Sequence, residues 1–145
     1  MKKFLFLLLL VLIISLGQNI EYIDSEKHKA TNIPFSQATV VNGVVYLSGQ
    51  IGKINNVVVS GGIKPETEQA LTNLKNILDG MGQSIDEIFK CTCILGGIKD
   101  WSEMSEAFIN FFDKEKIPIR STFTGSGLAG VWKIEIEGLA IQEKQ

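Results

Sequence analysis

Two segments of this chain place apolar side chains at helical spacing on one face only, and short strand-like runs surround them. Pro65 suits the first turn of the first helix, and Gly80 and Gly82 end it. The second begins near Asp100, where Glu103 completes a capping-box pattern. The apolar faces are formed by Ala70, Leu71, Leu74, Ile77, Leu78 and Met81, and by Trp101, Met104, Ala107, Phe108, Phe111 and Phe112. Such helices must cover another layer, so we expect these aromatic residues in a core rather than in a cofactor pocket.

The strand-like runs supply that second layer. Residues 37–41 and 44–50 flank Asn42-Gly43, a dipeptide that favours a type I′ hairpin turn. The other predicted strands are residues 51–60 (with a turn at Asn55-Asn56), 88–95, 120–124 and 132–141. The order hairpin, strand, helix, strand, helix, strand, strand predicts an α+β fold of two layers, a mixed six-stranded sheet with two helices on one face.

The N-terminus differs in character from the rest of the chain. Lys2 and Lys3 precede an apolar run over residues 4–14, and small residues follow ahead of a cleavage point before Gln18. This layout is typical of a secretory signal peptide over residues 1–17. It leaves one domain, residues 18–145, that is secreted or enters the lumen of the secretory pathway. A membrane anchor is the alternative, but the run is shorter than the roughly 20 apolar residues that span a bilayer.

The charge balance bears on the partners of the mature domain. The whole chain carries 14 basic and 16 acidic residues, and removal of Lys2 and Lys3 changes the net charge from −2 to −4. Nucleic acids and anionic membranes are bound by clustered Lys and Arg. We therefore expect neither nucleic acid nor, after cleavage of the signal, a membrane as a partner.

Several residues with reactive or ligand-binding potential are assigned no function. Cys91 and Cys93 lie two apart in a predicted strand and share a face, which favours buried structural thiols over half a metal site; an intermolecular disulfide is the alternative. His28 lies between two lysines and is interpreted as a solvated surface residue. Residues 125–130 read G-x-G-x-x-G, but a strand follows them instead of a helix, which excludes a dinucleotide-binding turn.

Arg120 and Glu135 are the candidates for chemistry. Arg120 is the only arginine of the chain. Its planar fork can bind a carboxylate through two parallel hydrogen bonds, so a ligand clamp and a structural ion pair are equally compatible with the sequence. Glu135 and Glu137 alternate with isoleucines and share one face of a strand. That face is either a solvated edge or, if another subunit covers it, a place for general acid/base catalysis.

Five short motifs occur in a fixed order along the chain. They are P-F-S-Q-A at 34–38, V-N-G-V-V-Y-L-S-G-Q-I at 41–51, E-T-E-Q-A-L-T-N-L at 66–74, P-I-R-S at 118–121 and K-I-E-I-E at 133–137. In this order they resemble the YjgF/RidA family of enamine/imine deaminases, also described as endoribonuclease L-PSP-like. The resemblance covers the chain from about Pro34 to Ala140.

The resemblance implies a chorismate-mutase-like fold in a barrel-like homotrimer, with sites in clefts between subunits. It implies hydrolysis of 2-iminobutanoate and 2-iminopropanoate to 2-oxo acids and ammonia, with no metal or cofactor. Arg120 matches the arginine that clamps the substrate carboxylate. Glu135 matches the acid that positions or activates water, and Ser48 and Gly49 match the pocket-lining S-G.

Three positions of the expected substrate site depart from the family pattern. Phe35 replaces a common Tyr, Thr122 replaces a common Cys, and Ser105 stands near a frequent Asn. Phe35 and the secretory signal favour an alternative, a non-catalytic secreted trimer that binds small carboxylates or a protein partner. Endoribonuclease activity is the weaker alternative, because the chain has no basic patch.

Overall fold

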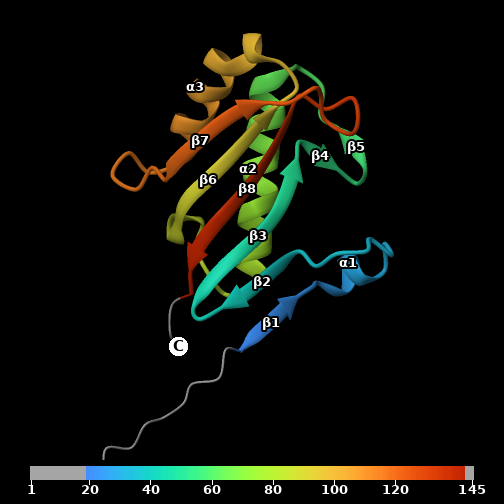
Figure 1. Cartoon of the computed structure of the whole chain (residues 1–145), viewed down its shortest axis with the longest axis vertical. Coiled ribbons are helices and arrows are strands. Elements are labelled where there is room, and N and C mark those ends of the chain that lie inside the picture. The colour runs from blue at the N-terminus through green and yellow to red at the C-terminus, as the bar shows by residue number, and fades with distance from the viewer. Residues whose placement is uncertain (1–18, 143–145) are drawn as a thin grey trace, which may run out of the picture.

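A mixed six-stranded sheet with helices on one face organises the chain (Figure 1), as seen in a computed structural model that describes residues 19–142. The sheet has the order β1-β2-β3-β8-β6-β7, in which only β6 and β7 are parallel. Its strands are β1 (Ile20–Ile23), β2 (Ala38–Val41), β3 (Val44–Ile51), β6 (Ile88–Leu95), β7 (Ile119–Thr124) and β8 (Ile134–Ile141). The predicted α+β class is confirmed, whereas the predicted signal peptide, residues 1–17, lies outside the described residues.

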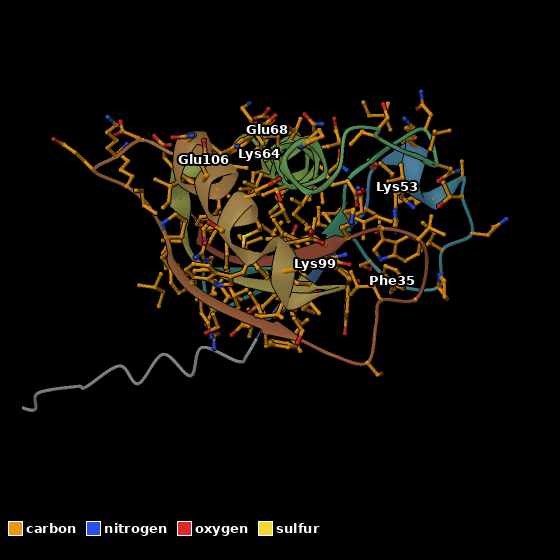
Figure 2. All side chains as sticks on the ribbon, turned by 90° about the horizontal axis from the view of Figure 1, so that it is seen from above. Phe35, Lys53, Lys64, Glu68, Lys99 and Glu106 are labelled. Atoms are coloured by element: carbon orange, nitrogen blue, oxygen red, sulfur yellow. The ribbon has the colours of Figure 1, made fainter. Side chains whose placement is uncertain are left out.

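The helices lie mainly on one side of this sheet. α2 (Ile63–Gly80) and α3 (Trp101–Phe111) pack against each other and cover the same face, and an ion pair between Lys64 and Glu106 joins them at 2.8 Å (Figure 2). The short α1 (Glu26–Lys29) lies at the side, beside β1 and β2 (Figure 1). Two single 3₁₀ turns, η1 (Ile85–Glu87) and η2 (Ile98–Asp100), flank β6. The second face of the sheet carries no helix among residues 19–142, and we call it the open face.

The sheet has six strands as predicted, but one of them differs. Residues 51–60 do not enter the main sheet and instead form a small hairpin of β4 (Lys53–Ile54) and β5 (Val57–Val58). The sixth strand is β1, which the sequence did not indicate because it is short and largely exposed. It forms because its backbone pairs with β2, a partner that the local pattern does not reveal.

The core lies between the helix layer and the sheet, as the periodicity predicted. Ala70, Leu71, Leu74 and Leu78 of α2 are fully buried. Their counterparts on the sheet and on α3 are Val45, Cys91, Cys93, Leu95, Met104, Phe108, Ile134 and Ile136. β8 therefore directs Ile134 and Ile136 toward the helices and its glutamates toward the open face.

The two helix starts differ from the expectation. α2 begins at Ile63, so Pro65 is its third residue rather than its first. Asp100 makes no side-chain cap on α3, because it lies in η2 with helical backbone angles. Its carboxylate instead lies 3.4 Å from the ammonium of Lys133, so the predicted capping box is wrong.

The interpretation of His28 as a solvated residue is also wrong. Its side chain is 12% exposed, and its Nε2 lies 2.7 Å from the carbonyl oxygen of Phe35 and 3.5 Å from a carboxylate oxygen of Asp24. Asp24 also accepts hydrogen bonds from Ser36 and from the backbone N–H of Gln37. These contacts fasten α1 to the chain that leads into β2, which is a structural role.

Cys91 and Cys93 are free thiols on the helix side of the sheet, which confirms their interpretation as buried residues. Burial raises the pKa of Cys93 from 9.0 to about 12 and raises the pKa of Cys91 as well, with the nearby Arg120 charge opposing both shifts. No helix within residues 19–142 is both long and apolar enough to cross a bilayer.

We predict that these thiols make stability fall as pH rises from about 9 toward 12. The unfolded chain releases the thiol protons in this window while the folded chain keeps them, so unfolding is favoured. Urea unfolding at several pH values measures the effect, and the double variant Cys91→Ala/Cys93→Ala controls for other titrating groups. An identical pH slope in the variant and the wild type would contradict the prediction.

Candidate functional site

Arg120 projects from β7 toward the helix layer. Its register partner on β6 is Cys91, which is fully buried beneath the helices, so both side chains lie on the helix side of the sheet. Ser105 and Thr122 were predicted to belong to the same site. Thr122, two residues beyond Arg120 on the same strand, faces the same way, and Ser105 faces the two from α3.

Four residues of α3 surround the guanidinium, and we call them the Arg120 cradle. The Nη2 group donates a hydrogen bond to the Ser105 hydroxyl at 2.7 Å, and Nη1 lies 3.7 Å from the sulfur of Met104. The guanidinium carbon lies 4.9 Å from the ring centre of Phe108 and 5.9 Å from that of Trp101. Aromatic faces attract a cation, so the cradle fixes the charge without neutralising it.

No carboxylate forms an ion pair with Arg120 in the described part of the chain, whereas six other ion pairs occur there. The side chain is half-buried, and N–H donors beyond those directed at Ser105 and Met104 remain available. A structural ion pair, one of the two interpretations of the sequence, is therefore absent from residues 19–142. The geometry favours the other interpretation, a clamp for an external carboxylate.

Thr122 adds a hydroxyl group to this half of the site. Its Oγ1 atom is buried and has no hydrogen-bond partner among the described residues. Buried polar atoms are nearly always paired, so this hydroxyl is one of few exceptions among the described residues.

Glu135 lies on the other face of the sheet, against Gly49. A Cβ atom added to Gly49 would approach the Glu135 carboxyl carbon to 2.9 Å and its Cγ to 3.0 Å, so a larger residue there would force the Glu135 side chain to move. The contact follows from a bulge in β3, where the pairing with β8 shifts between Leu47 and Gln50. Ser48, Gly49 and Glu135 thus form a second group, the Glu135 half-site.

Neighbouring side chains and backbone support this half-site. The side-chain amide of Gln50 donates to the carbonyl oxygens of Ser48 and Gly49 at 3.1 and 3.0 Å. The Ser48 N–H donates a hydrogen bond to the carbonyl of Gln37. This contact places the segment that follows Phe35 next to the Glu135 half-site. Phe35 itself is 59% exposed and lies on the side of the molecule away from Lys64 and Glu106 (Figure 2).

The structure thus divides the predicted site residues into two groups rather than one. Arg120 faces the helices with Ser105 and Thr122, while Glu135 pairs with Ile94 and faces the open side of the sheet. β6 lies between their strands. Within one chain, the guanidinium and the carboxylate therefore cannot meet around a single small ligand.

Sequence reasoning missed three parts of the cradle, since Met104, Trp101 and Phe108 were all assigned to the core. Trp101 and Phe108 were assigned to the core alone, although Trp101 is 46% exposed and both rings lie against Arg120. Their spacing of seven places them on one helix face, but this pattern is also that of an ordinary core helix. Only the position of β7 distinguishes the two roles.

The described residues include no group of three or more His, Cys, Asp or Glu side chains placed to hold a metal ion. A cavity of about 410 Å³ lies elsewhere, where α1, the β4–β5 turn and α2 meet, and none of the predicted site residues lines it. The Arg120 cradle and the Glu135 half-site therefore both lie outside this cavity.

The contact between Gly49 and Glu135 yields a stability prediction. Gly49→Ala forces the flexible Glu135 side chain aside and is expected to destabilise the fold by about 1 kcal/mol, the low end of the cost of overpacking. The same change in a Glu135→Ala background should be much less harmful, because the clashing group is gone. Urea unfolding at one fixed protein concentration measures this cycle.

Gly97→Ala is the matched control, because its backbone is extended and a Cβ there meets nothing within 4 Å. We expect it to be close to neutral in both backgrounds. If Gly49→Ala were equally destabilising with and without Glu135, the packing of the two residues would not be as described.

The sequence of this chain is similar to a known protein family and to several of its named members. Residues 26–142 match the family described as Endoribonuclease L-PSP. The human protein named 2-iminobutanoate/2-iminopropanoate deaminase is 37% identical over 111 residues, which cover 75% of this chain and 80% of the human one. The bovine protein of the same name is 33% identical over 122 residues, covering 83% and 88%.

Solved structures give the same result. The crystal structure of the yeast protein YEO7 matches with a TM-score of 0.78 at 28% identity, over 86% of this chain and 100% of the yeast chain. Relatives named as imine deaminases, at this level of identity, support a RidA-type function for the family as a whole. The chain therefore belongs to the YjgF/RidA family, with the family's fold and its Endoribonuclease L-PSP sequence pattern.

Proposed function

We propose that this protein hydrolyses 2-iminobutanoate- and 2-iminopropanoate-type intermediates to 2-oxo acids and ammonia. Water adds to the carbon of the C=N bond, the nitrogen is protonated, and the C–N bond then breaks to release ammonia and leave a C=O group. The observation that carries the proposal is the half-buried Arg120, which has N–H donors to spare and no acid partner among residues 19–142. The names of the human and bovine relatives support it.

Each residue has a defined task in this proposal. Arg120 binds the substrate carboxylate through two hydrogen bonds and so fixes the orientation of the reactive carbon. Thr122 lies on the same side of β7, two residues from Arg120, and borders the carboxylate end of the site. Glu135 holds the attacking water and accepts its proton, while Gly49 leaves space for the carboxylate. A protonated imine is already electrophilic, so positioning and proton transfer are sufficient for the reaction.

The proposed site requires more than one copy of the chain. Because Arg120 and Glu135 face opposite sides of the sheet, the guanidinium of one copy has to meet the carboxylate of its neighbour. The open face supports such an assembly, since it exposes the apolar side chains of Ile20, Tyr22, Tyr46, Ile119, Phe123 and Ile141. We propose a homotrimer in which the open faces line the centre of the assembly, and in which the edge strand β7 that carries Arg120 borders the open face of the next copy, so that the sites lie between subunits.

The location of the protein is part of the proposal. The signal-like residues 1–17 direct the chain to the secretory pathway, where it acts on imines formed outside the cytosol. The mature domain needs no nucleic acid or membrane as a partner.

Subunit mixing tests the proposed site. Arg120→Ala and Glu135→Ala are each expected to reduce kcat/KM by about 100-fold, since each loses a charge-assisted contact. Imine is supplied by an amino-acid oxidase, and its loss is followed spectroscopically. Lys75→Ala, a remote loss of one positive charge on α2, serves as the control and should retain full activity.

When the two inactive variants are co-refolded in equal amounts, about a quarter of the wild-type activity should return, because a quarter of the interfaces then combine an intact Arg120 with an intact Glu135. No recovery in verified mixed trimers would mean that the two residues do not share a site across subunits.

A non-catalytic binding protein is the second candidate, and Phe35 favours it because the ring lacks the hydroxyl group that a tyrosine would bring to the site. In that case 2-oxobutanoate raises the Tm of the wild type, Arg120→Ala abolishes the increase, and no imine is consumed above the buffer rate. Turnover by the wild type would exclude this candidate.

A further inference from the structure

Glu66 is a buried carboxylate that the proposed reaction does not use. It lies in the first turn of α2 and is 4% exposed. Burial of a charge is costly unless hydrogen bonds compensate it. Its Oε2 atom accepts a hydrogen bond from the backbone N–H of Lys133 at 2.7 Å, across 67 positions of sequence. A buried acid that binds a distant backbone group is suited to hold that backbone in place.

Lys133 is the point at which three parts of the fold meet. Its N–H binds Glu66 on α2, and its carbonyl accepts from the N–H of Gly96, which follows β6, at 2.9 Å. Its ammonium lies 3.4 Å from the Asp100 carboxylate in η2, at the start of α3. We call Glu66, Gly96, Asp100 and Lys133 the Lys133 junction.

The junction adjoins both halves of the proposed site. Lys133 stands two residues before Glu135, at the entry to β8. Asp100 directly precedes Trp101, the first residue of the helix that carries the Arg120 cradle. A displacement of Lys133 would therefore move the Glu135 carboxylate on one face of the sheet and the start of the cradle on the other.

The first turn of α2 also contacts the segment after Gly49. A Cβ atom on Gly52 would lie 2.5 Å from both the Cα and the carbonyl oxygen of Glu66, so the two backbones are in close contact that only glycine permits. Gly52 follows β3 by one residue. The backbone of Glu66 thus abuts the strand end that shapes the Glu135 half-site, while its carboxylate holds β8.

We propose that Glu66 is a positioning residue, which sets the relative placement of the Glu135 half-site and the Arg120 cradle through Lys133. It touches neither substrate nor water. Its effect on turnover rests on the proposed function, but its effect on the conformation of the junction does not.

Three variants separate positioning from stability. Glu66→Leu removes the hydrogen-bond acceptor, whereas Glu66→Gln keeps a side-chain oxygen at the same distance from the backbone. Thr67→Val is the control, because it removes a buried hydrogen bond from the adjacent hydroxyl to the Ile63 carbonyl, within α2. We expect Glu66→Leu to reduce kcat/KM about 10- to 100-fold, as displacements near 1 Å do. Glu66→Gln should restore most of the activity, and Thr67→Val should retain it in folded protein. Equal losses in Glu66→Leu and Thr67→Val would overturn the proposal.

Intrinsic fluorescence gives a readout that needs no substrate. The chain has two tryptophans, and each adjoins the junction: Trp101 follows Asp100, and Trp132 precedes Lys133. In folded protein, the emission spectrum should shift in Glu66→Leu but not in Glu66→Gln or Thr67→Val. An unchanged spectrum in Glu66→Leu would refute the proposal even if the enzyme is active. A shift without any turnover in the wild type would support the junction and refute the proposed function instead.

Discussion

The lone guanidinium of Arg120 is the interaction on which the functional interpretation depends. A half-buried cation without a counter-ion loses hydration that a neutral hydroxyl and a sulfur replace only in part. The aromatic faces of Phe108 and Trp101 compensate further but supply no negative charge. A carboxylate that arrives from outside the chain restores the balance. The proposed preference of the site for an acid therefore rests on the Arg120 cradle itself.

The sheet imposes the second constraint, because it separates this cation from Glu135. Side chains alternate between the two faces of each strand, so the register alone assigns Arg120 to the helix side and Glu135 to the open side. The proposed assembly through the open face would cover exposed apolar residues such as Tyr46 and Phe123, and the edge strand β7 of the next copy would supply the second half of each site. In this proposal, the assembly and the placement of Glu135 depend on the same face of the sheet.

Local periodicity predicted much of the fold. It reports only on residues that are close together in the sequence, and this decides which predictions were correct. The apolar faces of α2 and α3, the Asn42-Gly43 hairpin and the alternation along β8 depend on neighbours in sequence, and these predictions are confirmed. Partners distant in sequence decide the rest. β1 forms on the edge of β2, and Asp100 binds Lys133 instead of capping α3. The sequence is compatible with Arg120 as a ligand clamp or as part of a structural ion pair. The choice between them depends on whether an acid lies near the cradle, and none does within residues 19–142.

The departures from the family pattern differ in what they change. Ser105 is shorter than the frequent asparagine, yet its hydroxyl still accepts a hydrogen bond from the Arg120 guanidinium at 2.7 Å. The guanidinium is therefore still held by a side chain of α3. Thr122 keeps a polar group on the helix side of β7, and that group is unpaired among residues 19–142. These two departures therefore leave the proposed carboxylate clamp in place. Phe35 alone removes a hydroxyl group, and it lies on the segment that runs into the Ser48 side of the site. Any difference in chemistry from the relatives is accordingly expected on the water side of the substrate, where Glu135 has to act without help from residue 35.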